Sequence, residues 1–185
     1  TDRLTHASRQ ALLGSLTSQT AVDFTESNAY AITIWVIKNA NKYYDKQIVD
    51  TLNKMVGSAN IKLYKSNKKL YGDEDWRYLR DSEVSHYGLE TRIVMGRVGG
   101  VNNSSKYDYP NNLSRMAHDF LDDLLVIANN LYFEPNDDQG SRQKIWESGK
   151  THEFYLKNGE VLMSVKAFKN GNLHIKFDQD FIKAL

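Results

Sequence analysis

Two Asn-Gly dipeptides near the C-terminus, at residues 158–159 and 170–171, restrict the fold of this chain more than any other feature. Asn158, Gly159, Asn170 and Gly171 tolerate the positive φ angles of tight hairpin turns. The segments beside them alternate apolar and polar residues, as half-buried strands do. We therefore predict a three-stranded antiparallel β-meander over residues 151–178, with these four residues in structural turns.

The first hairpin is predicted to close with a two-residue turn at residues 158–159. This register places apolar residues opposite each other: Phe154 against Met163 and Leu156 against Val161. Continued along the strands, it places His152 on the inner face of the meander, opposite Val165. A buried His at such a position is usually hydrogen-bonded, which is what we expect here.

The second hairpin needs a longer loop. A two-residue turn would pair Val165 with Lys176 and so mix the two faces of the sheet. A three-residue loop, Lys169-Asn170-Gly171 with Gly171 in the left-handed conformation, shifts the register by one residue. Every inward pair is then apolar: Ala167 with Leu173, Val165 with Ile175, and Met163 with Phe177.

The same register predicts the outer face of the meander. This face carries Ser164, Lys166, Phe168, Asn172, His174 and Lys176, with Tyr155 and Leu162 on the neighbouring strands. Cations beside an exposed aromatic ring are suited to phosphates and stacked bases. Polar residues also alternate outward on every half-solvated strand, where they contact only water, and this situation is the commoner one. The candidate nucleic-acid-binding residues are Lys166, Phe168, Lys169, Asn172, His174 and Lys176.

The remaining pattern predicts a single domain of the α+β class, in which a helical N-terminal half packs on the meander. The leucines from Leu4 to Leu16 recur at helical spacing. Ser27 is the expected N-cap of a second helix that ends near Tyr43, although its β-branched centre also suits a strand. Asp45 is the expected N-cap of a third. Residues 1–66 are thus mostly helical, residues 67–112 irregular with a short strand near 91–95, and residues 113–132 helical.

The helix predicted at residues 113–132, which we expect to start at Pro110, carries an apolar stripe and an acidic face. His118 and Asp122 are four residues apart, so with Asp119 and Asp123 they have the spacing of a metal site. The apolar stripe directs the acids toward solvent, however, and a solvated acidic face is the favoured interpretation. We expect no metal.

The chain contains no Cys, which excludes disulfides, thiolate zinc sites and Cys nucleophiles. This composition fits a reducing compartment, and we expect a cytoplasmic location. No segment has the roughly 18 uncharged apolar residues of a membrane span, so no membrane association is expected. Because the net charge is only +1, any contact with phosphate must come from a local patch.

Motifs of methyltransferases, Walker loops and serine hydrolases are absent, and no cofactor is expected. An RNase-like site could combine His174, Lys176, Lys166 and His86 as general acid, base and phosphate clamp. Sequence spacing does not place His86 near His174. The segment 96–100 lacks the strand–GxGxxG–helix context of a phosphate-binding loop and is predicted to be a plain loop.

The run Phe168-Lys169-Asn170-Gly171-Asn172-Leu173-His174, set between two strands, carries a family resemblance. With softer matches at residues 88–94 and 113–131, the chain from about Asp45 onward resembles domain of unknown function 4942, a family of phage- and plasmid-borne proteins. Its members occur alone or joined to adenine-methyltransferase-like domains. The resemblance implies work on or near nucleic acid, with a methyltransferase as a possible partner. It supplies no catalytic residues, and methyl transfer does not carry over because this chain lacks the methyltransferase portion.

Three hypotheses for function follow. The leading one is a non-enzymatic accessory module of a mobile genetic element that binds DNA or RNA through the outer hairpin face. The second is a small metal-independent nuclease, or a nucleotide- or RNA-modifying toxin, centred on His174. The third is a protein-interaction module that blocks a host defence protein. The sequence favours a protein that is not an enzyme.

Overall fold

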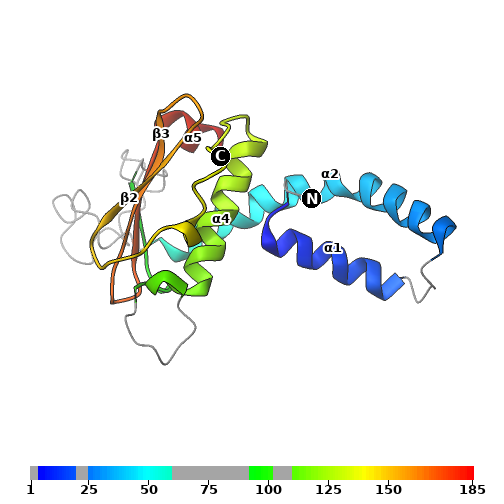
Figure 1. The fold of residues 1–185 in the computed structure, drawn as a ribbon, viewed down its shortest axis with the longest axis horizontal. Helices are drawn as coiled ribbons and strands as arrows, with labels where there is room; N and C mark the ends of the chain where they lie inside the picture. Colours follow the sequence, from blue (N-terminus) through cyan, green and yellow to red (C-terminus); the bar gives the residue numbers. More distant parts are fainter. Residues whose placement is uncertain (1–3, 20–24, 60–91, 102–109) are drawn as a thin grey trace, which may run out of the picture.

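The computed structural model describes residues 4–19, 25–59, 92–101 and 110–185. Helices dominate its N-terminal half, and a four-stranded antiparallel sheet dominates its C-terminal half. The predicted α+β class is therefore confirmed. Figure 1 shows a body of sheet and helices from which a pair of helices extends. That the whole chain forms a single domain stays a prediction.

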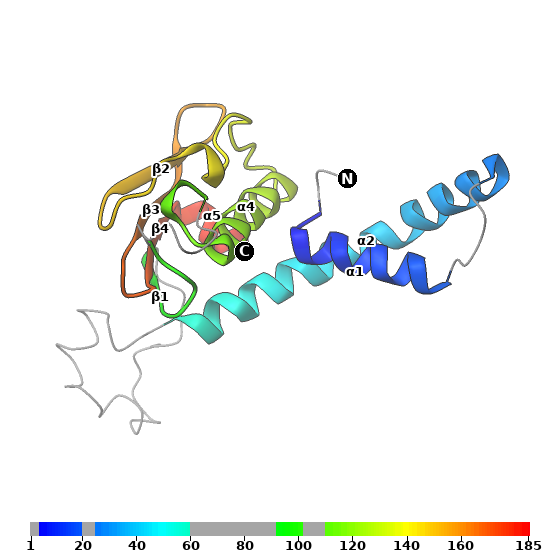
Figure 2. The same cartoon turned by 60° about the horizontal axis from the view of Figure 1, so that its bottom comes forward.

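The extending pair consists of α1 (His6–Gln19) and α2 (Glu26–Ser58), which run antiparallel and project beyond the body in both views (Figures 1 and 2). Helix α2 is one continuous helix, so the prediction of two helices or a strand is wrong. Its N-cap is Thr25, whose side chain accepts a hydrogen bond from the Asn28 amide, and Asp45 lies within the helix. The β-branched segment, residues 32–37, is helical despite its local propensity, and further along α2 the Tyr43 hydroxyl lies 3.2 Å from Ser15 Oγ of α1.

The body is built on α4 (Arg115–Asn130), which follows a short 3₁₀ turn, η3 (Pro110–Asn112). Ser114 caps α4 by accepting a hydrogen bond from the Ala117 amide at 3.2 Å. The helix therefore begins at Arg115, five residues later than the predicted start at Pro110. The apolar stripe of α4 is buried against one face of the sheet, as the sequence pattern indicates.

The sheet contains β1 (Arg92–Met95), β2 (Thr151–Tyr155), β3 (Val161–Ala167) and β4 (Leu173–Phe177) in the order β1-β4-β3-β2. The meander thus has a fourth strand, since β1 pairs with β4 along its free edge. A second 3₁₀ turn, η4 (Ser141–Gln143), precedes the sheet, and α5 (Gln179–Ala184) follows it. We define the inner face as the one covered by α4 and the outer face as the opposite one.

The register of the second hairpin is confirmed, with Val165 opposite Ile175 and Gly171 at φ +84°. The two-residue turn predicted for the first hairpin is wrong. The Leu156 amide donates to the Glu160 carbonyl at 2.8 Å, which encloses a three-residue loop, Lys157-Asn158-Gly159. Both hairpins therefore use the same Lys-Asn-Gly loop, with the Gly in the left-handed region each time.

A β-bulge reconciles this loop with the strand register further along. Phe154 lies opposite Met163, as predicted, but Tyr155 lies opposite Val161, so Leu162 is the extra residue. Leu162 is fully buried rather than on the outer face, which corrects its predicted position. The reason is that a bulge bends its strand and breaks the strict alternation of side chains.

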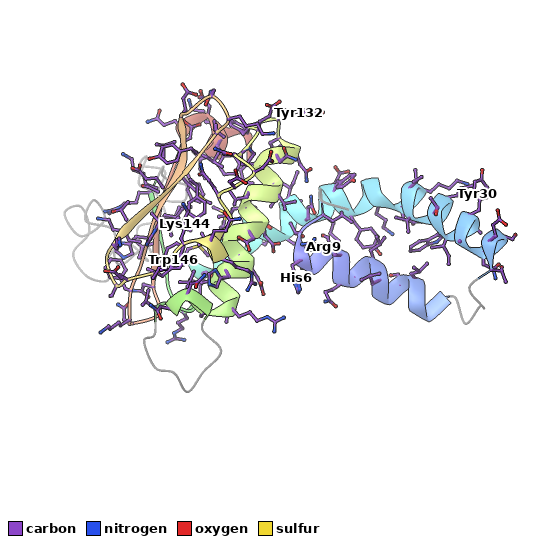
Figure 3. All side chains as sticks on the ribbon, viewed as in Figure 1. His6, Arg9, Tyr30, Tyr132, Lys144 and Trp146 are labelled. Carbon is purple, nitrogen blue, oxygen red and sulfur yellow. The ribbon has the colours of Figure 1, made fainter. Side chains whose placement is uncertain are left out.

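The inner face is closed by the segment before β2. Trp146 is fully buried, and its Nε1 donates to the Ser141 carbonyl at 3.0 Å. Lys144 places its ammonium 4.8 Å from the ring centroid of Phe154 (Figure 3). His152 lies opposite Val165 as predicted, with its ring centroid 4.4 Å from that of Trp146. Its buried Nε2 has no hydrogen-bond partner in the described parts of the chain, so the expected hydrogen bond is not formed at this nitrogen.

Candidate functional site

Two rows of residues cross the outer face of the sheet from strand to strand. The first row is Arg92 on β1, Lys176 on β4, Ser164 on β3 and Glu153 on β2. The second row is Val94, His174, Lys166 and Thr151, in the same strand order. Neighbouring strands are about 4.8 Å apart, so each row brings together residues that are remote in sequence.

A pocket of about 310 Å³ opens over these rows, and we call it the basic pocket. Its lining residues are Arg92, Thr151, Ser164, Lys166, His174 and Lys176. Three permanent cations and one His line it, together with two hydroxyl groups, and no acid is among the lining residues that the structure describes. Such a lining is suited to an anion with several oxygens, because Arg, Lys and hydroxyl groups all donate hydrogen bonds to phosphate.

Like charges lie close together in the basic pocket. Arg92 and Lys176 lie directly opposite each other, an arrangement of like charges that destabilises a sheet. Within the described ranges, no carboxylate forms an ion pair with Arg92, Lys166 or Lys176. Burial lowers the pKa of His174, and the nearby charges of Arg92 and Lys166 lower it further. A bound anion would offset this repulsion.

The structure divides the predicted binding residues into two groups. Lys166, His174 and Lys176 line the basic pocket. Phe168, Lys169 and Asn172 do not line it, although Phe168 adjoins it through its ring, 4.5 Å from that of His174. Phe168 is half-buried rather than exposed, Lys169 is exposed in the hairpin loop, and Asn172 pairs with the Phe168 amide through its backbone carbonyl.

Arg92 and Thr151 are pocket residues that the sequence argument missed. Arg92 begins the strand that was predicted near residues 91–95, but the three residues that follow it are all apolar, so no alternation assigns Arg92 to a face. What the sequence lacked was the partner of this strand, because β1 and β4 are about eighty residues apart in the chain. Thr151 is placed by its pairing with Lys166.

A second pocket, of about 380 Å³, adjoins the basic pocket and shares Ser164 and Lys176 with it. Its other lining residues are Glu153, Val161, Phe177, Asp178 and Gln179. The Tyr155 hydroxyl donates a hydrogen bond to the Glu153 carboxylate, which raises the pKa of Tyr155. Asp178 caps α5, since its Oδ1 accepts from the amides of Asp180 and Phe181. Hydrogen-bond acceptors therefore dominate this second pocket.

The glycine loop at residues 96–100 has a structural role. A Cβ on Gly100 would lie 1.8 Å from the Phe168 carbonyl oxygen, so the backbones of this loop and the second hairpin approach very closely. The Val101 amide donates to the same oxygen at 3.2 Å. This packing explains the glycine without a phosphate ligand and agrees with the prediction of a plain loop.

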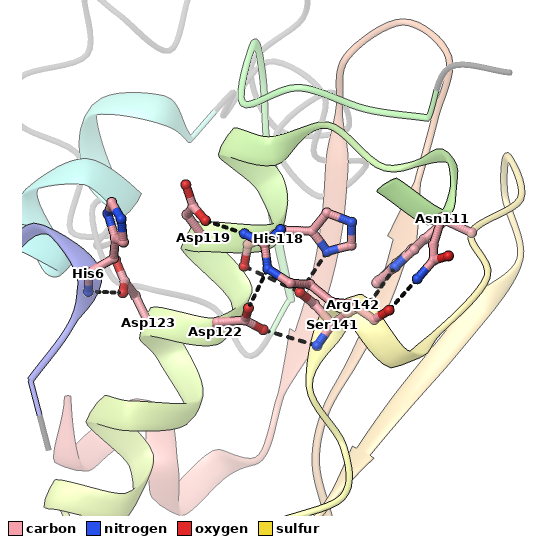
Figure 4. A network of polar contacts seen from close by, with 9 residues as sticks. His6, Asn111, His118, Asp119, Asp122, Asp123, Ser141 and Arg142 are labelled. Atoms are coloured by element: carbon pink, nitrogen blue, oxygen red, sulfur yellow. Dashed lines mark hydrogen bonds and ion pairs between the residues drawn. The ribbon is translucent and has the colours of Figure 1, made fainter. Parts of the chain in front are cut away.

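The acidic face of α4 is not simply solvated, because its acids contact other parts of the chain (Figure 4). Arg142 forms ion pairs with Asp119 and Asp122 at 2.6 and 3.6 Å, and the Ser141 amide donates to Asp122 at 3.0 Å. On the same helix, Asp123 accepts a hydrogen bond from the His6 amide at 2.8 Å. The acids thus anchor η4 and the start of α1, contacts that the helical period alone could not reveal.

His118 lies on the buried side of α4. It is fully buried, with Nδ1 2.7 Å from the Ser141 hydroxyl, whereas Asp119 and Asp122 pair with Arg142. Across residues 4–19, 25–59, 92–101 and 110–185, no three metal-binding side chains come together. His86, the partner of His174 in the RNase-like hypothesis, lies outside the described residues.

Comparisons with known proteins identify one similarity. A family model described as Domain of unknown function (DUF4942) matches residues 1–185. No curated protein and no solved structure shows a significant match. Among the helices that the structure describes, none is long and apolar enough to cross a membrane.

Proposed function

The chain belongs to the DUF4942 family over its whole length, and from this premise we propose that it binds single-stranded nucleic acid through the outer face of its sheet. The observation that carries the proposal is the basic pocket. Three cations from three strands, unpaired with any described carboxylate, surround a cavity large enough for a phosphate group. Like charges placed opposite each other destabilise a sheet, and a bound polyanion would reduce the repulsion between Arg92 and Lys176.

The form of the site favours a single strand over a duplex. The net charge of +1 supplies little attraction outside the pocket, whereas proteins that wrap duplex DNA depend on broad positive surfaces. Phe168 and His174, both half-buried, place two rings in contact beside the cations, and unpaired bases stack on the faces of such rings. An accessory module of a mobile element, located in the cytoplasm and acting beside a methyltransferase, remains part of the proposal.

Titration of labelled single-stranded DNA, single-stranded RNA and duplex DNA tests the proposal. We expect a Lys166→Ala/Lys176→Ala double variant to bind a single strand at least tenfold more weakly than wild type. The slope of log affinity against log salt should fall by about 1.4, because each phosphate contact on a single strand contributes about 0.7. A Lys150→Ala/Lys157→Ala variant is the matched control, since these lysines are ion-paired to Glu147 and Asp137 outside the pocket. Binding that ignores both salt and the pocket variant would disprove the proposal.

A second candidate, a metal-independent ribonuclease, is favoured by the lowered pKa of His174. A His that is neutral at pH 7 can accept a proton from a ribose hydroxyl, and the neighbouring cations can hold the phosphate. Incubation of purified protein with labelled RNA distinguishes this candidate from simple binding. RNA turnover that His174→Ala abolishes would establish it, and RNA that stays intact at stoichiometric protein would exclude it.

A further inference from the structure

We propose that the second pocket receives the ribose of the nucleotide whose phosphate occupies the basic pocket, so that the site prefers RNA to DNA. The inference rests on the proposed function and names its ligand more closely. It starts from the first row, which changes from two cations, Arg92 and Lys176, through Ser164 to the carboxylate of Glu153. Three strand spacings, about 14 Å, separate its ends.

This gradient fixes how a nucleotide lies on the sheet. The phosphate belongs at the cationic end, because Glu153 repels it at the other. The Tyr155 hydroxyl donates to Oε2 of Glu153, so a hydrogen-bond donor in the second pocket would bond to Oε1 of the same carboxylate. A divalent cation is a poor alternative, since Lys176 lines the same pocket and repels it.

The ribose 2′-hydroxyl can act as this donor. Glu153 and Ser164 lie directly opposite each other on β2 and β3, so their side chains emerge side by side on the outer face. A hydroxyl that both donates and accepts can bond the carboxylate and the Ser164 hydroxyl together. Val161, which is 40% exposed, provides an apolar wall for the sugar carbons. Deoxyribose has a CH₂ group at this position, so the hydrogen bond to the Glu153 carboxylate is lost and the affinity is lower.

The experiment compares matched RNA and DNA octamers of one sequence by fluorescence anisotropy. Wild type should bind the RNA about ten- to a hundredfold more tightly, the effect of one hydrogen bond to a charged group. Glu153→Ala should bring the RNA-to-DNA affinity ratio close to one, while DNA affinity stays the same or rises as a negative charge is removed. Ser164→Ala should lower the ratio by a smaller factor.

Glu147→Gln is the matched control, because Glu147 is exposed, pairs with Lys150 and lines neither pocket. Circular dichroism melts establish that each variant folds. A wild-type ratio near one, or a ratio that Glu153→Ala leaves unchanged, would overturn the inference. If the RNA preference is absent but Lys166→Ala/Lys176→Ala still weakens DNA binding, the inference about ribose fails and the proposed function is retained. If wild type binds neither RNA nor DNA, the proposed function itself fails.

Discussion

Single residues in this protein are constrained by close backbone contacts and by buried rings. Gly100 allows one loop to touch the Phe168 carbonyl, and His152 fills a space between Trp146 and the sheet without a described hydrogen-bond partner for Nε2. In both places the local sequence shows only a Gly in a glycine-rich loop and a His on a strand. The contact that explains each residue is with another segment of the chain: the Phe168 carbonyl for Gly100 and the Trp146 ring for His152.

Gly100→Ala is expected to destabilise the protein by about 2 kcal/mol or more, because backbone must move to make room for the new methyl group. Gly14→Ala is the control. A Cβ there meets nothing within 4 Å, and replacing Gly by Ala in a helix stabilises it by about 0.5–1 kcal/mol. Urea unfolding of both variants measures the two changes, and equal stabilities would contradict this account.

The stability of the fold should decrease as the pH falls below about 6.5, the usual pKa of His. Burial is the main cause of the lowered pKa of His152, and Lys144 and Lys150 lower it further. The unfolded chain then binds more protons than the folded one, so this contribution is complete above pH 6.5 and is lost toward the folded-state pKa. His152→Phe keeps a ring against Trp146 and should unfold with a smaller change between pH 7.5 and 5.5 than wild type. An identical pH dependence in the two proteins would show that His152 does not contribute.

At the scale of elements, charge and hydrogen bonding decide what each strand and turn does. Strand β1 brings Arg92 against Lys176 on β4, which weakens the sheet while creating the basic pocket. The turn η4 is held on α4 by a buried Ser141–His118 contact and by partly exposed ion pairs of Arg142. The buried Ser141–His118 contact and the partly exposed ion pairs of Arg142 should differ in strength, so single substitutions can measure the contribution of each to stability.

Lys176→Thr is expected to stabilise the fold by about 0.2–1 kcal/mol, because it removes a like charge from opposite Arg92. The gain should shrink as salt screens the repulsion. Lys150→Thr, which removes an ion-paired lysine, should bring no such gain. Thermal melts at low and high salt measure both variants; a Lys176→Thr protein less stable than wild type at low salt would show that the repulsion is relieved in some other way.

Ser141→Ala should cost about 1–3 kcal/mol, because it removes the hydroxyl that lies 2.7 Å from Nδ1 of a fully buried His118. Arg142→Ala should cost less than about 1 kcal/mol, because its ion pairs with Asp119 and Asp122 are partly exposed and screened by solvent. Chemical denaturation of the two variants tests this order, and the reverse order would mean that the ion pairs hold η4 in place.

At the scale of the whole molecule, the C-terminal end of α2 joins the helical pair to the body, because Met55 is buried in the core and the Gly96 amide donates to the Ser58 carbonyl at 2.9 Å. Within the pair, the Thr5 amide donates to the buried Gln47 side chain of α2 at 2.9 Å. The His6 amide donates to Asp123 of α4 at 2.8 Å and so connects the start of α1 to the body. Lys54 places its ammonium 4.8 Å from the ring centroid of Phe120 at the same junction. Further out, the pair has no part of the body beside it, and Figure 3 shows Tyr30 near its far end.

Gln47→Ala is expected to loosen α1 without unfolding the body, because it leaves the buried Thr5 amide without its acceptor. Hydrogen exchange followed by mass spectrometry should show faster exchange in residues 6–19 and unchanged protection in β3 and β4. Gln10→Ala, at an exposed position on α1, should change neither. Equal acceleration throughout the molecule would mean that the helical pair and the body unfold together.

The sequence by itself determined the second hairpin, its register and the outward direction of Lys166, His174 and Lys176. The turn chemistry of Asn and Gly and the two-residue period of a strand act over only a few residues, so they can be read locally. The sequence also indicated the apolar stripe of α4. The family resemblance carried by the hairpin was confirmed over the whole chain.

Only the tertiary structure decided which elements meet. It joined β1 to β4 and so brought Arg92 into the pocket, it kept α2 helical through Asp45, and it turned the acids of α4 toward η4 and α1. It also buried Leu162 through a bulge. Each of these outcomes depends on packing between segments far apart in the chain, and hydrophobic periodicity shows that a face is buried without showing its partner. The basic pocket needs three strands at once, so no stretch of sequence contains it.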